Sequence, residues 1–401
     1  LASSAFVFFF FLGLQAGLIH LLPYRYWKRV SVWIQLTSLF VVLFGFFLVP
    51  AISAPGVLTS PANRSVIAAV PSFWFLGLYQ AMLGTPDPVI HWLARRALIA
   101  LAACLSIALS GYLLGYGRHV RKTIEESGAI ADTRRASRQW AKRLLDLLIV
   151  RDPCQRAVFW FVCRTMFRNR VPRLILAAYA SIGIVYVIDG LSGALKNIGR
   201  SHVLIEPNAA MSAFPLILPF FLLLGMRVLF AFPVEVRANW AFRIIGEGDP
   251  VIPLRAVRKL MIVAGIAPVC LFSLPMYGLL WGWWVAIRHV ALSALITGIL
   301  LQLLTTGFYK IPFTCTFMPG KSNLKGWFTV YVVGFLIAAF CIIHLELWLA
   351  TDVSRAVKGV VIFAAILALA TWRRRRDETG VAARLIYEER ANWQLNTLEL
   401  T

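Results

Sequence analysis

The chain alternates long apolar runs with shorter polar connections, and this pattern predicts helices that cross a membrane. A helix needs about 20 predominantly apolar residues to span the hydrocarbon core of a bilayer. Runs of this kind recur along the whole sequence. They cover residues 2–22, 32–54, 96–117, 173–195, 211–233, 258–280, 285–308, 328–349 and 356–372. We therefore predict an all-α, polytopic transmembrane helical bundle with about nine spans.

Composition strengthens this prediction and bears on the start of the chain. Of the 401 residues, 60% are apolar and 14% charged, whereas soluble domains are close to half apolar and a quarter charged. The chain begins with Leu1 inside an apolar run, which indicates that it is N-terminally incomplete. A second long run follows the first almost directly, so we interpret residues 2–22 as a span and not as a signal peptide.

The basic residues give the predicted spans a direction. If the connection 23–31 faces the cytoplasm, strict alternation places 32 of the 40 Lys and Arg residues on that side and eight on the other. Such a bias is typical of cytoplasmic connections. It predicts a multi-pass protein of a bacterial inner membrane with a cytoplasmic C-terminus. The net charge of +22 then faces anionic lipid, so the expected partner is the bilayer and not nucleic acid.

The connections divide the predicted protein into four parts. We expect a first membrane segment with three spans and an outer loop at 55–94, a basic cytoplasmic insertion, a six-span membrane domain and a cytoplasmic tail. Within the outer loop, the apolar stretch 72–83 is too short to cross and predicts an interfacial or re-entrant helix. The four parts cover residues 1–117, 118–172, 173–372 and 373–401.

The insertion contains two predicted helices, at 137–150 and 154–168. The second carries Trp and Phe among Arg residues directly before a span. That composition suits a helix lying in the membrane interface, and it equally suits a helix packed beneath the spans. Both placements remain open at this point.

A tetrapeptide, RANW, occurs at Arg237–Trp240 and again at Arg390–Trp393. The flanking residues do not match, so the repeat gives no evidence of duplication. Arg contacts phosphate and Trp favours headgroup depth, which predicts anchoring at the inner interface. Together with the basic insertion and one inner turn, this gives a set of candidates for contact with a partner or with lipid. They are Arg156, Trp160, Arg164, Arg168, Arg237, Trp240, Lys321 and Lys325.

No motif for a nucleotide, a metal or another cofactor is present. The segment CTFMPGKSN at 315–323 places Gly320 before a Lys and a Ser, as a phosphate loop does. The first glycine of G-x-x-x-x-G-K-[ST] is replaced by Cys315, however, and the segment joins two predicted spans. The six cysteines form no CxxC pair, so we predict neither a disulfide framework nor a zinc site. Any ATP that drives this protein would bind to another chain.

Ionisable residues at membrane depth are costly, and each is a candidate site by default. The predicted topology places all of them in the outer leaflet. They could line an outward-facing cavity for a polar or headgroup-bearing substrate, or each could rest at the interface with its charge in water. The five residues are Asp189, Arg288, His289, His344 and Glu346.

The run RDPCQRAVFWFVCRTMFRNRVPRLILAAYASIGIVYV at 151–187 carries a resemblance. A basic interfacial segment leading into a span resembles the elbow helix of ABC-2-type exporter permeases. The six spans that follow residue 151 equal the number in one such permease half, and three further spans precede them. The resemblance implies a permease without an ATP site, served by a separate ATPase. VEVRANW and KIPFTC…PGKSNLKG are also similar to a bacterial family of multi-span proteins that brings no activity with it.

These observations favour the membrane subunit of an export system, without catalysis of its own. Its ATPase would dock on 118–172, 234–257 or 309–327, and the chain could form homo- or hetero-oligomers. The first alternative is an integral-membrane enzyme acting on lipid, with Asp189, His344 and Glu346 as its acid–base groups. The second is a scaffold subunit of a membrane complex without a site of its own.

Overall fold

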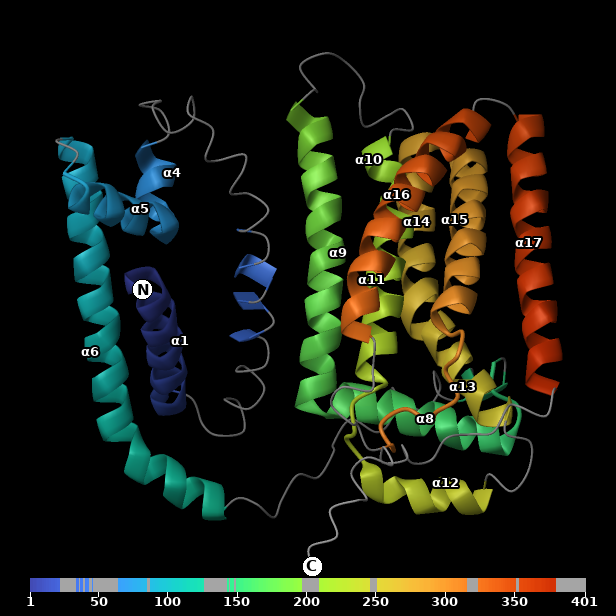
Figure 1. Ribbon diagram of the computed structural model, residues 1–401, viewed down its shortest axis with the longest axis horizontal. Helices are drawn as coiled ribbons and strands as arrows, with labels where there is room; N and C mark the ends of the chain where they lie inside the picture. The colour runs from blue at the N-terminus through green and yellow to red at the C-terminus, as the bar shows by residue number, and fades with distance from the viewer. Residues whose placement is uncertain are drawn as a thin grey trace, which may run out of the picture. The chain divides into compact units, whose positions relative to one another are not determined.

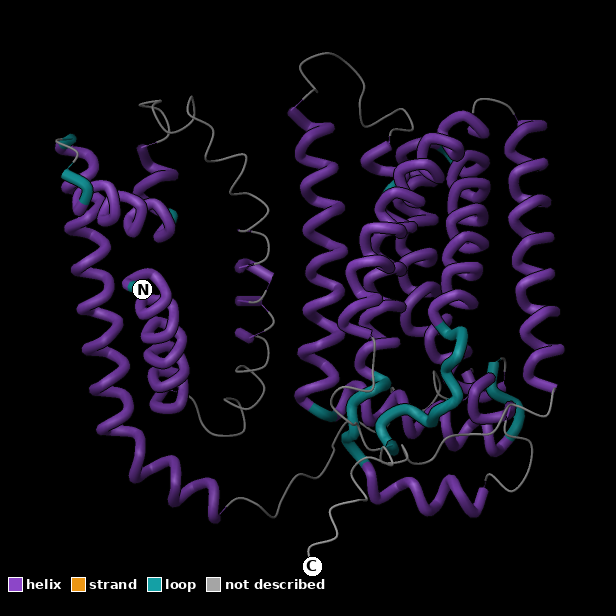
Figure 2. Tube along the Cα trace, viewed as in Figure 1, coloured by secondary structure: helices purple, strands orange, loops and turns teal. Residues whose placement is uncertain are grey.

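The computed structural model is helical, and the part of the chain that it describes contains no strand (Figures 1 and 2). Every statement below concerns that part. It comprises residues 1–21, 34–35, 37–38, 40–42, 45, 64–84, 87–125, 143, 145–147, 149–196, 209–245, 251–315, 324–350 and 353–379.

The chain forms two compact units, residues Leu1–Arg134 and Arg135–Thr401. In the first unit α1 and α5 pack against the long helix α6. Gly111 of α6 allows a close approach, because a Cβ atom there would lie 2.5 Å from the Cβ of Ala16 on α1. The predicted short helix at 72–83 corresponds to α5. The helices of this unit are α1 (Ala2–Leu21), α4 (Arg64–Ala69), α5 (Pro71–Met82) and α6 (Pro88–Glu125).

The second unit is a bundle of long helices with shorter ones at its ends (Figure 1). Two short helices, α10 (Ala209–Ser212) and α12 (Asn239–Ile245), and the 3₁₀ turn η3 (Val236–Ala238) lie in its connections. The remaining elements are α8 (Pro153–Arg168), α9 (Arg170–Lys196), α11 (Phe214–Leu229), α13 (Val251–Met261), the π-helical η4 (Ile262–Ile266), α14 (Ala267–Trp281), α15 (Trp283–Leu304), α16 (Leu324–Ala350) and α17 (Val353–Thr379).

Six helices of the described chain are long and apolar enough to cross a membrane, so this is a helical integral membrane protein. The predicted count of about nine spans is not confirmed. The predicted spans 2–22 and 328–349 appear as α1 and α16, whose qualifying apolar stretches are shorter, Ala2–Gly17 and Val332–Glu346. The predicted span 32–54 lies largely outside the described residues, as does the predicted helix 137–150. The six are Pro88–Gly111, Arg170–Ile188, Met211–Leu229, Val251–Trp281, Trp283–Leu304 and Val353–Arg376.

Helix α8 lies across one end of the second unit, at the lower edge of Figure 1. Its sequence explains both its start and its inner face. The side chain of Asp152 caps the first turn by accepting a hydrogen bond from the Gln155 amide at 3.0 Å, and Pro153 opens the helix, as is typical of helix N-termini. Val158, Val162 and Thr165 share one face at helical spacing and are buried. Its main partner is α13, so α8 packs beneath the spanning helices.

The centre of the bundle is the apolar helix α11, which has more of its surface covered than the other candidate spans. Phe220, Leu223 and Met226 are buried against α9, η4 and α15. The π-helical turn η4 joins α13 to α14 and contains Gly265. A Cβ atom at Gly265 would lie 2.7 Å from the Met226 methyl group, so this glycine allows η4 to approach α11 closely.

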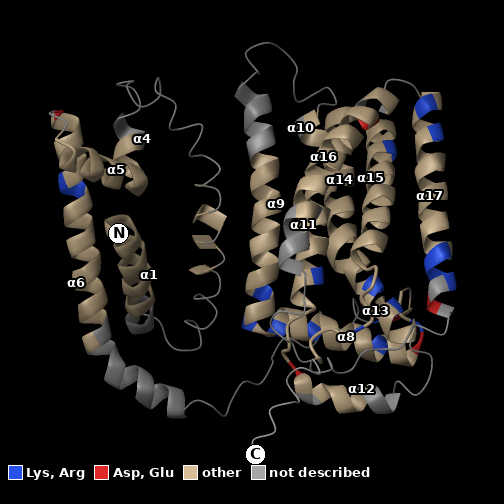
Figure 3. Ribbon diagram, in the orientation of Figure 1, with Lys and Arg blue, Asp and Glu red and all other residues tan. Residues whose placement is uncertain are grey.

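Charged side chains gather at the α8 end of the bundle (Figure 3). Arg258 of α13 forms a two-armed ion pair with Glu378 of α17. The Lys259 ammonium donates to the Ile149 carbonyl at 2.7 Å and to the Gln155 side chain at 2.8 Å. These bonds hold α13 against α17 and against the segment before α8. Arg258 and Lys259 therefore connect the helix ends at the place where the apolar surface stops.

The Arg258–Glu378 pair generates a stability prediction. Glu378 stands at the C-terminal end of α17, where the helix dipole disfavours an acid, and its side chain is 6% exposed. Glu378→Gln should leave Arg258 without a counter-charge and lower the free energy of unfolding by about 3 kcal/mol. The measurement is equilibrium unfolding of the purified chain in detergent.

Two variants control for this experiment. Arg375→Gln removes an exposed charge on the same helix and should change stability by less than about 0.5 kcal/mol. The double variant Arg258→Met with Glu378→Leu should recover most of the loss, because a buried apolar pair needs no counter-charge. Unfolding of Glu378→Gln at the wild-type denaturant concentration would contradict the assignment.

Candidate functional site

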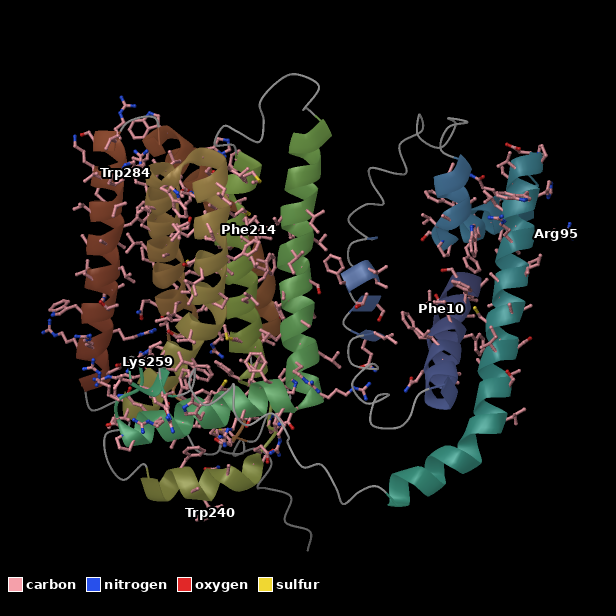
Figure 4. The ribbon with its side chains drawn as sticks, turned by 180° about the vertical axis from the view of Figure 1, so that it is seen from behind. Phe10, Arg95, Phe214, Trp240, Lys259 and Trp284 are labelled. Carbon is pink, nitrogen blue, oxygen red and sulfur yellow. The ribbon has the colours of Figure 1, made fainter. Side chains whose placement is uncertain are left out.

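A buried pair of a histidine and a carboxyl group lies at the end of the bundle opposite α8. His289 in the second turn of α15 contacts Glu346 near the C-terminal end of α16 through its Nδ1 atom and the carboxylate Oε1. Both side chains are only 6% exposed. Figure 4 shows the two ends of the bundle, with Trp284 of α15 at the end where α15 begins and Lys259 near α8. The pair therefore belongs to the far end of two apolar helices.

Aromatic side chains enclose the imidazole, and a turn brings them there. Gly282, with φ of +87°, separates α14 from α15; this left-handed conformation favours glycine. The reversal places the rings of Tyr277 and Trp281 at 4.9 and 5.7 Å from the His289 ring. The Tyr277 hydroxyl donates to the Met211 carbonyl at 2.6 Å, which orients its ring. The reversal lies within the sequence WGWW at 281–284.

Four buried polar atoms here have no hydrogen-bond partner in the described chain. They are Nε2 of His289, Oε2 of Glu346, Nη1 of Arg288 and Nε1 of Trp281. The same four residues, with Ser212 and apolar side chains of α15, α16 and α17, line a cavity of about 30 Å³. By this measure one water molecule needs about 10–15 Å³. We call this cavity and its four polar residues the polar pocket.

The structure brings together three of the five residues that the sequence singles out. Arg288, His289 and Glu346 line the polar pocket. His344 is exposed on α16, and its Nδ1 lies 2.8 Å from the Phe340 carbonyl; it does not line the pocket. Asp189 lies on α9, but its side chain is outside the described residues. His289, which sequence analysis did not name as a partner of Glu346, is the residue that pairs with it.

The pocket also contains residues that the sequence analysis did not identify. Ser212 and Trp281 line it, and Tyr277 stacks against Trp281 and faces the His289 ring; none of the three was a candidate. Trp281 and Tyr277 are four residues apart and so share a helix face, and the nearby ionisable pair at 288–289 begins the next helix. That combination could have indicated an aromatic wall beside His289.

A second polar feature is an open groove on the outer face of α8, with a volume of about 630 Å³. Arg156, Trp160, Arg164 and Arg168 recur every four residues and line it. These are four of the residues that the sequence predicts to contact a partner or lipid. Glu235, beside η3, lines the groove as well. We call this surface the basic groove.

The groove has acidic neighbours, but they balance only part of its charge. The Trp160 indole donates to Asp146 at 2.6 Å, and Arg156 lies 3.8 Å from the same carboxylate. Arg168 lies 3.7 Å from Glu235, in a pair that is largely exposed. Exposed pairs of this kind contribute at most about 1 kcal/mol. The positive potential of Arg164 and Arg168 therefore remains available to an anionic group.

The structure describes the other predicted interface residues only in part. Trp240 lies on α12 at the α8 end (Figure 4) and is exposed. Arg237 belongs to η3 and Lys325 to the first turn of α16, but their side chains are not described. Lys321 and the second RANW segment lie outside the described residues.

One cysteine adjoins the groove. Burial raises the pKa of the Cys154 thiol, and the negative charge of Asp152 raises this pKa further. A thiol with a raised pKa is a weak nucleophile at neutral pH, so Cys154 is not a candidate for nucleophilic catalysis. Within the described ranges, no group of three or more His, Cys, Asp or Glu residues converges as a metal site would require.

Comparison of the chain with models of protein families, with curated proteins and with solved structures gave no match. Function must therefore be argued from the polar pocket and the basic groove themselves.

Proposed function

We propose that the chain is the membrane-embedded subunit of a transport system, and that the polar pocket is its functional centre. The observation that carries this proposal is the His289–Glu346 pair buried among helices with the length and composition of membrane spans. An ionisable pair in such surroundings costs several kcal/mol unless it is compensated, and residues of this kind typically mark ion or substrate pathways. The unpartnered polar atoms beside the pair add to that cost.

The architecture around the pocket supports movement. Pro275 lies within α14, between η4 and the pocket, and Pro219 lies within α11. Proline and π-helical turns free backbone carbonyls and allow helices to bend. A bend in α14 would displace Tyr277 and Trp281 against His289. Pro275 thus provides a hinge position two residues from Tyr277 and six from Trp281, next to the polar pocket.

We further propose that a separate ATPase drives transport and docks at the α8 end. No nucleotide motif is present in the chain, and the basic groove offers Arg164 and Arg168 to an acidic element of a partner. Charge complementarity of this type steers association and fixes register. The groove lies on the face of α8 opposite its buried stripe, so a soluble partner could approach it.

A scaffold subunit without a site of its own is the second candidate. It is favoured by the tight packing of the interior around α11 and by the small volume of the polar pocket, about 30 Å³, far below the roughly 300–1,000 Å³ of sites for drug-sized ligands. The lipid-enzyme alternative has less support, because exposed His344 and buried Glu346 do not share a cavity.

The transport proposal predicts that Glu346→Gln abolishes function while leaving assembly intact. In host cells that lack the chain, wild type should restore export of the affected compound, identified by comparing metabolites in cells and medium. Glu346→Gln should restore it at a rate lower by about tenfold or more, since losing 1.4 kcal/mol from a rate-determining interaction has that effect. Membrane levels of the variant should match wild type.

The matched control is His344→Gln, which changes an exposed residue two positions away on the same helix and should behave as wild type. Equal export by Glu346→Gln at equal abundance would refute the proposed role of the pocket and favour the scaffold.

The docking proposal predicts that charge reversal in the groove separates the chain from its ATPase. Arg164→Glu with Arg168→Glu should lower the affinity for the copurifying ATPase by about tenfold or more, because two favourable contacts become repulsive. Affinity and chain-stimulated ATP hydrolysis are measured together on the purified complex.

The control is Arg373→Glu with Arg375→Glu, the same charge change on exposed residues of α17. Undiminished affinity after reversal in the groove, or an equal loss in the α17 control, would show that the groove is not the specific docking surface.

A further inference from the structure

We propose that the His289–Glu346 pair is a proton-binding site, loaded and unloaded through the polar pocket. The inference rests on the proposed function, since it names the ligand of the same pocket. It draws on the size of the pocket, on the chemistry of the atoms around it and on the burial of the pair.

Size sets the first restriction on the ligand. A cavity of about 30 Å³ holds about two water molecules. Organic cargo does not fit it as it stands. The ligand of the pocket is therefore an ion, a water molecule or a proton carried by water.

The chemistry of the atoms that face the pocket distinguishes among these possible ligands. Nη1 of Arg288 and Nε1 of Trp281 can only donate hydrogen bonds, whereas Oε2 of Glu346 accepts and Nε2 of His289 does either. A hard cation needs several oxygen ligands, and a structural Zn²⁺ site needs four ligands. Only Oε2 and Nε2 of these four atoms could ligate a metal, and the guanidinium would repel it. A simple anion would face the carboxylate. Water can accept from the donors and donate to the acceptors, so the set suits proton exchange through water.

The pair itself supplies the acceptor. With Glu346 ionised and His289 neutral, the pair carries one negative charge, and its outer atoms Oε2 and Nε2 both accept. A proton delivered from bulk water through the pocket binds to one of these atoms and makes the pair neutral. Release returns the proton to water and restores the negative charge, so no other reactant is needed.

The surroundings make this change of charge consequential. Arg288 is the one fixed cation among the described residues that line the pocket. Together with the negatively charged pair it gives a local charge of zero, which becomes plus one when the proton binds. Tyr277 and Trp281 on α14 face the imidazole, Ser212 is the last residue of α10, and α17 contributes apolar Ala356 and Val360. In a site of low dielectric constant, each added charge interacts strongly with the charges and dipoles around it. The pair joins α15 to α16, so protonation acts on the contact between two helices.

The test is a pH titration of the full chain in lipid nanodiscs, followed by two spectroscopic probes. Infrared difference spectra report a protonated carboxyl group, and ¹⁵N resonances of labelled histidine report the imidazole. We expect a pH-dependent signal from one or both members of the pair. The Glu346→Gln variant should lose the carboxyl band, and His289→Gln should move the midpoint of Glu346 by about one pH unit or more, as expected for a coupled pair.

Three controls test whether the titration belongs to the pair, whether an ion causes it, and whether the variants are folded. His344→Gln should leave the carboxyl titration unchanged. Exchange of sodium for potassium, and of chloride for a larger anion, should also leave the midpoint unchanged at constant ionic strength. A midpoint that follows one of these ions would overturn the proposal in favour of an ion site. Circular dichroism and thermal unfolding confirm that each variant is folded.

The proposal is overturned if wild type and Glu346→Gln give the same spectra and His289 does not titrate between about pH 4 and pH 9, the range that buried Glu and His residues reach. It is also overturned if Glu346 and His289 titrate without influence on one another. Its failure is distinct from that of the transport proposal. If the pair titrates but the chain does not support export, the transport proposal is wrong and the proton site stands. If the chain supports export but the pair does not titrate, the proton site is wrong and the transport proposal stands.

Discussion

Polar groups that are cut off from water must find partners within the chain, and this constraint governs the structure of the protein. For the backbone it allows only helices in the apolar part, because each helix satisfies its own amides and carbonyls. For side chains, the same constraint places charged residues near the ends of the helices. Arg374, for example, donates to the Gln302 side chain at 2.7 Å and to the Gln302 carbonyl at 2.6 Å, which fastens α17 to α15 where the apolar surface stops.

The polar pocket is where this constraint is met least completely. Around α11 the interior consists of well-packed apolar residues, and at the α8 end Arg258 and Lys259 have partners. At the opposite end, His289 and Glu346 satisfy one atom each and leave the other unpartnered. An apolar pair of similar volume would often be at least as stable. A cost of this kind, close to Pro275 of α14, is typical of a site that is retained for function and not for stability.

The membrane fold was predictable from the sequence because its signal is long and repeated. Runs of about 20 apolar residues leave few alternatives to a spanning helix, and α9, α15 and α17 all lie where such runs occur. The exact count stays a prediction, because the described residues of α1 and α16 cover apolar stretches shorter than a span, Ala2–Gly17 and Val332–Glu346. The placement of α8 depended on what covers its Val158–Val162 face, which composition alone does not give.

The site was only half predictable for a related reason. Depth in a span identifies an ionisable residue as a candidate, so Arg288, His289 and Glu346 could be named. Which of them meet depends on the rotation of each helix. His344 and Glu346 are two residues apart, about 200° around a helix of 3.6 residues per turn, and so cannot share one face. The aromatic wall of Tyr277 and Trp281 depends on the reversal at Gly282, which brings α14 back along α15.

The central claim is that the α8 end and the pocket end of the bundle lie on opposite sides of one membrane. The most direct measurement is labelling of single-cysteine variants at Arg164 and Ser354 in intact cells with a reagent that does not cross membranes. Both positions are exposed. The account predicts that cysteine at 354 is labelled in intact cells and that cysteine at 164 is labelled only after permeabilisation. Labelling of both from the same side would contradict it.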